Sequence, residues 1–377
     1  MNDSSAATGL QYLSHASLIQ HVTSPVRSTA RLDAIIVPAA RPAKNLTTAI
    51  SLAQAADCHL IVLCSRRARP EEVQTLFAAK NFSRGTAVEL PARYSHDLLK
   101  FGTSEWAKTD VGKLACGERD SDLSAKRNIG LLLARLRGWR RIFFMDDDIR
   151  GISASDLDRT VSLLGADGAG HRSAGLRVKY FPDNSVVCHA RRKAGQHQEV
   201  FVSGSILAVD TTASIAFFPD IYNEDWLFFY NDVAARRMAT PGLLATQMKQ
   251  ISYNPFADRN RAAREEFGDV IAEGLYSLLH SGLRWQAATS GYWLRFIDQR
   301  MRILDEIIDH ADTSKGHIWA QIADSAVSAR KTLTDIQPGM CAAYIETWQQ
   351  DLRDWSKRLT ELRPVGTVKE ALLQLGL

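Results

Sequence analysis

Three consecutive aspartates, Asp146-Asp147-Asp148, directly follow an apolar run at residues 142–145. Like charges in a row repel one another unless a cation, hydrogen-bond donors or water compensate them. In an extended chain alternate side chains share one side, so we expect Asp146 and Asp148 to project together and Asp147 to point away. Two such carboxylates suit Mg²⁺ or Mn²⁺, with coordination positions left for phosphate oxygens. The alternative is a solvated acidic turn before a helix at 153–157.

The chain upstream of the triplet alternates between short apolar runs and segments with helical spacing. The expected strands lie at 34–37, 59–64 and 141–145, the first stopped by Pro38, and the expected helices lie at 46–56, 71–80 and 124–138. Strand, helix and strand at this spacing form a βαβ unit with parallel strands. Residues 31–150 therefore predict a doubly wound α/β sheet, which binds ligands at the carboxyl ends of its strands.

The other segments have weaker or different patterns. Gly, Pro and Ser punctuate residues 81–122, where we expect short strands and loops. Further strands are expected at 178–181, 185–189 and 200–209. From about residue 261 the chain turns to long helical stretches with breaks at 313–316 and 337–339, which predict about four helices. Residues 1–30 lack a clear period and predict a poorly ordered extension or a short surface helix.

Composition limits the class of protein. The 377 residues, 45% hydrophobic and 23% charged, suit one large α/β domain or two modest ones. The net charge of +4 is too small to indicate an electrostatic nucleic-acid binder. Five scattered cysteines without zinc-site spacing indicate a reduced, cytoplasmic chain. No apolar run approaches the roughly 18 residues of a membrane span.

The order of these features resembles the nucleotide-sugar-binding half of glycosyltransferases with the GT-A fold, especially those of the family 2 type. Asp146-Asp147-Asp148 matches that family's DxD motif, which holds a divalent metal against the diphosphate of a sugar nucleotide. The segment Phe-Val-Ser-Gly-Ser-Ile-Leu-Ala at 201–208 is similar to the small-residue strand of the sugar-donor pocket, and Asn-Glu-Asp-Trp at 223–226 resembles the acceptor-side ED motif. The resemblance covers about residues 31–254.

This resemblance implies a GT-A (Rossmann-like) mixed sheet in a catalytic domain at 31–258, with a helical region at 259–377. It implies Mn²⁺ or Mg²⁺ at Asp146 and Asp148, and Asp225 as the general base of an inverting enzyme, with Glu224 holding the acceptor. Other contacts to the nucleotide-sugar donor are expected from Pro38, Ala39, Arg41, Arg66, Lys126, Arg127, Asp147, Gly204 and Ser205.

Several of these residues also have a plain structural interpretation. Lys126 and Arg127 open a helix, where cations and backbone donors suit phosphates, but they also fit as solvent-facing charges. Glu224 and Asp225 fit the first turn of a helix capped by Asn223. Many relatives place an acidic residue after the second strand to bind the nucleobase, whereas this chain has Ser65-Arg66 there. A UDP-sugar is the expected donor.

The leading hypothesis is therefore a metal-dependent hexosyl- or pentosyltransferase. A sugar-nucleotide mutase or nucleotidyltransferase on a related fold would use the same acidic site. The Gly-rich signature with a following Lys that many nucleotidyltransferases carry is missing after Val37, which favours sugar transfer. A noncatalytic scaffold with a helical recruiting region is the third hypothesis. The sequence does not identify the acceptor, and a nucleic acid is among the candidates. The helical region is compatible with a homo-oligomer.

Overall fold

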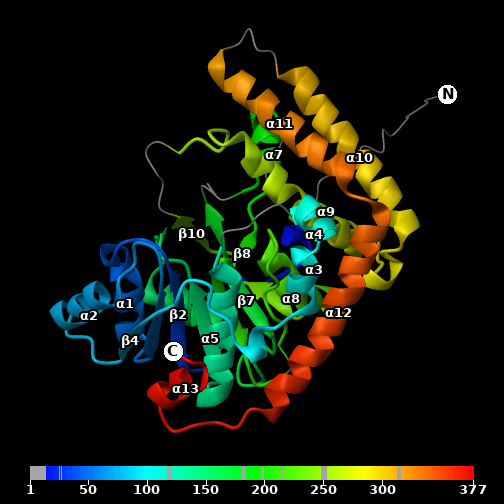
Figure 1. Cartoon of the computed structure of the whole chain (residues 1–377). Coiled ribbons are helices and arrows are strands. Elements are labelled where there is room, and N and C mark those ends of the chain that lie inside the picture. The colour runs from blue at the N-terminus through cyan, green and yellow to red at the C-terminus, as the bar shows by residue number, and fades with distance from the viewer. Residues whose placement is uncertain are drawn as a thin grey trace.

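The computed structural model describes residues 14–24, 26, 28–116, 121–179, 184–196, 199–213, 215–247, 253–311 and 316–377. A central sheet is flanked by helices, and the long helices of the C-terminal third stand beside it (Figure 1). The predicted mixed α/β class is confirmed. Among the described residues no helix is both long and apolar enough to cross a membrane.

The strands of the described chain form one mixed, mostly parallel sheet. They are β1 (Gln20–His21), β2 (Ala34–Ala39), β3 (His59–Cys64), β4 (Gly85–Glu89), β5 (Arg141–Met145), β6 (Ile149–Arg150), β7 (Ser173–Lys179), β8 (Val202–Asp210), β9 (Met238–Thr240) and β10 (Leu244–Gln247). Their order is β1-β9-β7-β8-β5-β2-β3-β4, and β10 pairs with β6 and β7. Because β8 runs antiparallel to β5, its amino end meets the carboxyl ends of β2, β3 and β5 at one edge.

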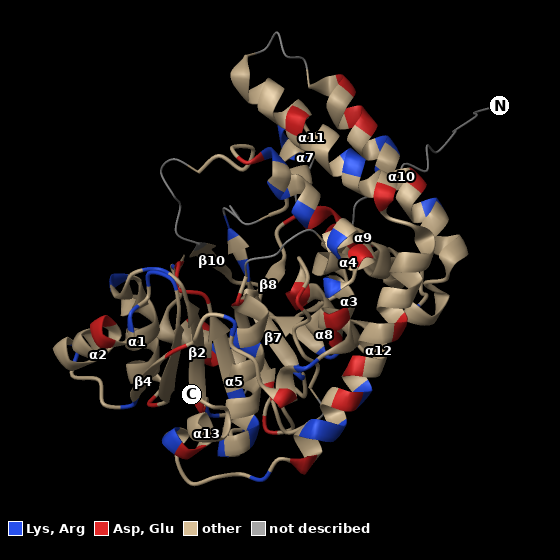
Figure 2. Ribbon diagram, in the orientation of Figure 1, with Lys and Arg blue, Asp and Glu red and all other residues tan. Residues whose placement is uncertain are grey.

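Helices cover both faces of the sheet and form the C-terminal third. They are α1 (Thr47–Ala55), α2 (Pro70–Ala79), α3 (Gly102–Lys108), α4 (Asp110–Cys116), α5 (Leu123–Arg137), α6 (Ala154–Val161), α7 (Val186–Lys193), α8 (Glu224–Ala234), α9 (Arg259–His280), α10 (Ser290–His310), α11 (His317–Asp335), α12 (Pro338–Glu361) and α13 (Val368–Gln374). Basic and acidic residues are mixed along α10, α11 and α12 (Figure 2), as expected for helices with a solvated face.

Alternate residues of each central strand enter two different cores, as the pleat of a strand requires. On β2, Ile36 belongs to the core under α5, whereas Ile35 and Val37 belong to the core under α1 and α6. A side chain at Gly130 of α5 would lie 2.8 Å from Ile36 and 2.9 Å from Phe144. Only glycine lets α5 approach the strands this closely. One helical turn earlier, Lys126 and Arg127 are thereby brought to the ends of the strands.

The helical C-terminal region shares the larger core with the sheet. Trp348 and Trp355 of α12 are fully buried in the same cluster as Phe144 and Tyr230. Trp355 donates from Nε1 to the carbonyl of Ala216 over 3.1 Å, and Tyr230 packs edge-on against Trp348. These helices are therefore packed on the sheet domain through a continuous hydrophobic core.

Several elements differ from the predicted ones. Residues 185–189 begin α7 and do not form a strand, because the Ser185 hydroxyl accepts from the Cys188 amide and caps a helix. The segment 81–122 contains α3 and α4 besides β4, and β2 continues through Pro38 to Ala39.

The N-terminal and C-terminal predictions also differ in detail. Residues 15–21, expected to be poorly ordered, form a 3₁₀ turn, His15–Ser17, and β1, because β1 pairs with β9 and His15 is buried. The described C-terminal third has the five α-helices α9 to α13, not about four, although α12 begins at the predicted break. The expected strand end at Phe181 and most of the break at 313–316 lie outside the described residues.

Candidate active site

The aspartate triplet lies in a turn just after β5. The strand ends at Met145, and the amide of Ile149 donates to the carbonyl of Asp146 over 3.2 Å. The alternation of a strand therefore does not extend through the triplet. Arg41 binds two neighbours, from Nη1 to Asp147 Oδ1 at 2.6 Å and from Nη2 to Asp148 Oδ2 at 2.9 Å. The expectation that Asp147 points away from Asp148 is thus wrong, because the turn brings both carboxylates to Arg41.

Asp147 fixes the loop that follows β2. Its Oδ2 accepts the backbone amides of Ala40 and Arg41, each over 2.8 Å, and its side chain is only 2% exposed. A carboxylate with charged and backbone donors on both oxygens is well compensated despite its burial. The predicted donor-binding residues Pro38, Ala39 and Arg41 therefore lie against the triplet at the carboxyl ends of β2 and β5.

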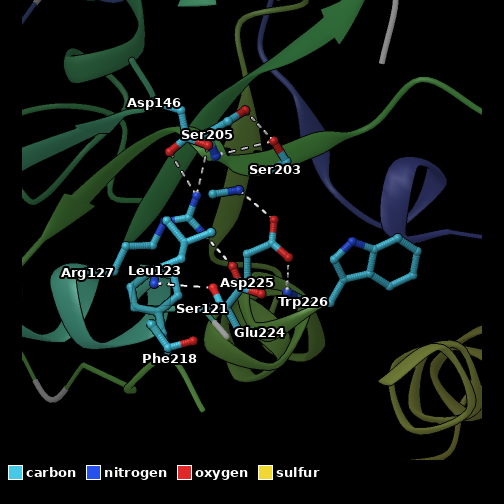
Figure 3. A network of polar contacts seen from close by, with 12 residues as sticks. Ser121, Leu123, Arg127, Asp146, Ser203, Ser205, Phe218, Glu224, Asp225 and Trp226 are labelled. Atoms are coloured by element: carbon cyan, nitrogen blue, oxygen red, sulfur yellow. Dashed lines mark hydrogen bonds and ion pairs between the residues drawn. The ribbon is translucent and has the colours of Figure 1, made fainter. Parts of the chain in front are cut away.

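Arg127 of α5 joins the triplet to the second acidic motif. Its Nη2 contacts Asp146 Oδ1 at 3.0 Å and its Nη1 contacts Glu224 Oε1 at 2.6 Å (Figure 3). The guanidinium also lies 5.4 Å from the ring centre of Phe218. Burial opposes the charge on Arg127, but Asp146, Glu224 and Asp225 outweigh it and raise the pKa of the guanidinium.

Asp225 stands in the first turn of α8 and contacts the strand that was predicted to line the sugar pocket. Its Oδ2 accepts the amide of Gly204 at 2.6 Å, and its Oδ1 accepts the amide of Trp226 at 2.9 Å (Figure 3). Burial raises the pKa of Asp225, and this effect exceeds the opposing ones of Arg127 and of the two amides. The carboxyl is therefore a stronger proton acceptor than an exposed aspartate.

Gly204 sits where three segments approach one another. A Cβ at this position would lie 2.7 Å from Nη1 of Arg127 and 2.9 Å from the Cβ of Asp225. Next to it, the hydroxyls of Ser203 and Ser205 are hydrogen-bonded at 2.6 Å, and the Ser205 carbonyl accepts the amide of Asp146 over 2.9 Å. Small residues at the start of β8 thus leave room for α5, α8 and the triplet to meet.

The ammonium group of Lys126 is occupied by contacts within the protein. Its Nζ donates to the Ala39 carbonyl at 2.8 Å and to the Ser65 hydroxyl at 2.6 Å, and lies 3.1 Å from Asp122 Oδ2. An ammonium group has three N–H donors, so these partners use all of them and leave none for a phosphate. Burial lowers the pKa of Lys126, while Asp122 opposes that effect. The lysine therefore ties α5 to the ends of β2 and β3, and Arg66 lies exposed just after β3.

The candidate metal ligands in the triplet are carboxylate oxygens, which suit a hard divalent ion. The described residues contain no group of three or more His, Cys, Asp and Glu side chains arranged to hold a metal. A set of one or two aspartates still fits Mg²⁺, which usually takes its other ligands from water and phosphate. Asp146 is the more accessible, with 18% of its side chain exposed, while Asp148 is 4% exposed and paired with Arg41.

Sequence reasoning did not find the contact between α8 and α9. The amide nitrogen of the Asn223 side chain donates to Asp269 Oδ1 over 2.8 Å, directly before the Glu224-Asp225 pair. One signal was present: Glu266, Asp269 and Glu273 share one face of a helix that is otherwise apolar there. Acids in an apolar stripe indicate a buried polar contact, but they do not identify the partner.

Comparisons with known proteins give partial likenesses. No family model matches the chain, and no curated protein matches it. Among solved structures, M. tuberculosis glucosyl-3-phosphoglycerate synthase is similar at 14% identity and a TM-score of 0.37, over 66% of this chain and 80% of that one. Mouse xyloside xylosyltransferase 1 in its apo form is similar at 10% identity and a TM-score of 0.25, over 56% and 78%. Likenesses this distant carry no argument about activity.

Proposed function

We propose that this protein is a glycosyltransferase that moves a sugar from a nucleotide-sugar donor to an acceptor hydroxyl. The observation that carries the proposal is the meeting of three motifs that lie far apart in the sequence. Arg127 contacts both Asp146 and Glu224, and Asp225 accepts the amide of Gly204. Residues expected on the donor side, in the sugar pocket and on the acceptor side thus surround one point at the carboxyl edge of the sheet.

On the donor side, we propose that Asp146 and Asp148 hold Mg²⁺ or Mn²⁺ and that the donor is a UDP-sugar. The bound ion would supply Lewis-acid stabilisation of the diphosphate leaving group. Arg41 is paired with Asp148 and is about a quarter exposed, so its guanidinium is also suited to the diphosphate. Asp147 holds the backbone of Arg41 in place during this step.

On the acceptor side, Asp225 is the proposed base. The acceptor hydroxyl attacks the anomeric carbon, the bond from that carbon to the diphosphate oxygen breaks, and the diphosphate leaves with the electron pair. The hydroxyl proton passes to a carboxylate oxygen of Asp225, whose raised pKa favours the transfer. A single displacement of this kind inverts the anomeric configuration. Arg127 keeps Glu224 and Asp146 at a fixed distance from each other throughout.

A panel of UDP-, GDP- and dTDP-sugars with Mn²⁺ or Mg²⁺ tests the proposal. We expect one donor to raise the melting temperature in the presence of metal and to be hydrolysed slowly, with water as the acceptor. Asp225→Asn should lower turnover about 10²- to 10⁴-fold, the usual contribution of a general base, while the donor still stabilises the protein. Asp298→Asn, which changes an exposed acid on α10, should leave both readouts unchanged.

Four results would contradict the proposal or one of its assignments. Loss of donor binding in Asp225→Asn would place this residue on the donor side and refute its role as the base. Release of pyrophosphate from a nucleoside triphosphate and a sugar phosphate would identify a nucleotidyltransferase. Finally, no donor-dependent stabilisation with either metal, or full turnover in Asp148→Ala, would exclude the metal-dependent transferase.

A further inference from the structure

We propose that α9 positions the catalytic pair of α8 through a relay from Arg300 to Asp269 to Asn223. This inference depends on the proposed function, because it assigns Asn223 and Asp269 as positioning residues for the base Asp225. The relay starts in the helical C-terminal region and ends at the residue just before Glu224.

Asn223 is the first member to consider, because its conformation is unusual for a residue at the start of a helix. Its φ of 61° is left-handed, and its side chain makes no capping bond to α8. The side-chain amide donates instead to Asp269 Oδ1 on α9 over 2.8 Å. Asparagine tolerates the left-handed conformation, and its bond to Asp269 fixes the side chain at the point where α8 begins.

Asp269 is itself held from the other side. Only 2% of its side chain is exposed, and its Oδ2 accepts from Nη2 of Arg300 on α10 over 2.9 Å. Arg300 is fully buried and binds Glu266 through two nitrogens and Glu273 Oε2 at 2.5 Å. A guanidinium shared among three carboxylates has a fixed fork of donors and little rotational freedom. The carboxylate that receives Asn223 is therefore fixed in place.

Two further contacts place α9 against both sides of the catalytic pair. A Cβ at Gly268 would lie 2.3 Å from the carbonyl oxygen of Tyr222, so α9 touches the backbone just before Asn223. On the other side, the hydroxyl of Tyr276 donates to the carbonyl of Trp226 over 3.0 Å. Residues 222, 223 and 226 are thus all held by α9, and Glu224-Asp225 lies between them.

The relay matters for chemistry because Asp225 has to meet a hydroxyl within hydrogen-bond distance. A displacement of about 1 Å at a catalytic group is enough to cost about a hundredfold in rate. The hydrogen bond of 2.6 Å from the Gly204 amide to Asp225 Oδ2 fixes where the carboxylate of Asp225 lies. A shift at the start of α8 changes that bond first, whereas the contacts of Arg41 with Asp147 and Asp148 do not involve α8.

Asn223→Gly is the test variant, because glycine accepts the left-handed conformation and removes only the side-chain bond. We expect kcat to fall about ten- to a hundredfold with the donor KM nearly unchanged and the melting temperature lowered by no more than a few degrees, the cost of one lost hydrogen bond. Asn81→Gly is the matched control, since Asn81 is also left-handed, at a φ of 51°, and is exposed beyond α2. It should change neither kcat nor KM.

Exchanging the two residues between positions 223 and 269 tests whether the lost rate can be rescued. Asn223→Asp alone places two carboxylates face to face and should lower kcat further, whereas Asn223→Asp combined with Asp269→Asn restores a donor opposite an acceptor and should recover most of the lost rate. A wild-type kcat in Asn223→Gly would overturn the relay. So would a fall in kcat that is fully explained by unfolding of the variant at the assay temperature.

A second readout separates this inference from the proposed function. In protein labelled with ¹⁵N-glycine, the amide resonance of Gly204 should shift in Asn223→Gly and return in the variant with the two residues exchanged, whether or not a donor is known. A shift without sugar transfer by the wild-type protein would support the relay and refute the proposed function. An unchanged Gly204 resonance alongside active wild-type protein would refute the relay alone.

Discussion

Two clusters in this molecule carry the same charges in opposite surroundings. In each, one arginine lies among three acids: Arg127 near Asp146, Glu224 and Asp225, and Arg300 near Glu266, Asp269 and Glu273. The first stands at the carboxyl edge of the sheet, where 18% of the Asp146 side chain is exposed. The second is closed between α9 and α10, where Glu266 has no exposed surface.

The difference shows how the same charges serve different ends. In the closed cluster the charges of Arg300, Glu266 and Asp269 depend on their partners, because water cannot replace a lost contact there. In the open cluster solvent or a ligand can reach Asp146, so its contact with Arg127 is exchangeable. The closed cluster is thus suited to hold helices together and the open one to bind and react, and Asn223 connects them through Asp269.

The largest expected effect comes from breaking the closed cluster. Arg300→Met would leave three buried carboxylates without their cation, and we expect a loss of about 3–5 kcal/mol in the free energy of unfolding. Urea unfolding at pH 7 measures it. Arg302→Met is the matched control on the same helix, because its ion pair with Asp298 is exposed and contributes about 0.5 kcal/mol or less. Equal losses for both variants would show that the closed cluster has no special role.

A smaller effect is expected from filling the space at the open cluster. Gly204→Ala would place a methyl group 2.7 Å from Arg127 and 2.9 Å from Asp225, closer than atoms normally approach. We expect about 1–3 kcal/mol of destabilisation, as for overpacked sites, together with a fall in turnover. Gly339→Ala on α12 is the control, because a Cβ there meets nothing within 4 Å. Gly170→Ala is less suitable, because the positive φ of Gly170 would strain an alanine. If Gly204→Ala and Gly339→Ala have the same free energy of unfolding and the same turnover, the close approach at Gly204 does not contribute to either.

The sequence predicted the open cluster better than the closed one. Asp146, Gly204 and Asp225 each belong to a short local motif at a strand end or helix start, which a pattern can identify. Their common partner Arg127 was assigned to phosphate because spacing alone does not show that a charge lies between two carboxylates 19 and 97 residues away.

The closed cluster and α7 were harder for physical reasons. The partner of Asp269 is set by how α8, α9 and α10 pack, and no local pattern contains that information. Residues 185–189 have the apolar composition of a strand, but the cap from Ser185 and packing against α9 favour a helix. In the same way the central βαβ strands could be predicted because their apolar runs are long, whereas α3 and α4 have seven residues each and each contains a glycine, which disfavours a helix.

The last prediction concerns His15, whose ring packs between α8 and α9. Its ring packs 4.8 Å from Trp226 of α8 and 5.4 Å from Tyr276 of α9, and its Nε2 bonds to the Val202 carbonyl at 2.7 Å. Burial lowers the pKa of His15 to about 3, against the effect of the Val202 carbonyl and with a contribution from His280. The imidazole is therefore neutral in the folded protein at every ordinary pH.

In the unfolded chain this histidine takes up a proton near the ordinary histidine pKa of 6.5, so between about pH 6.5 and 3 the unfolded state binds more protons than the folded one. Stability from the neutral His15 is thus complete above pH 6.5 and is lost as the pH falls toward 3, by up to about 1.4 kcal/mol per pH unit. His15→Gln keeps an N–H for Val202 but does not titrate, and should flatten the decline measured by urea unfolding between pH 6 and 4. His21→Gln, at an exposed position on β1, is the control. An equal slope in wild type and His15→Gln would mean that His15 takes up its proton in the folded protein as readily as in the unfolded chain. The packing of α8 and α9 around the imidazole would then be looser than its burial indicates.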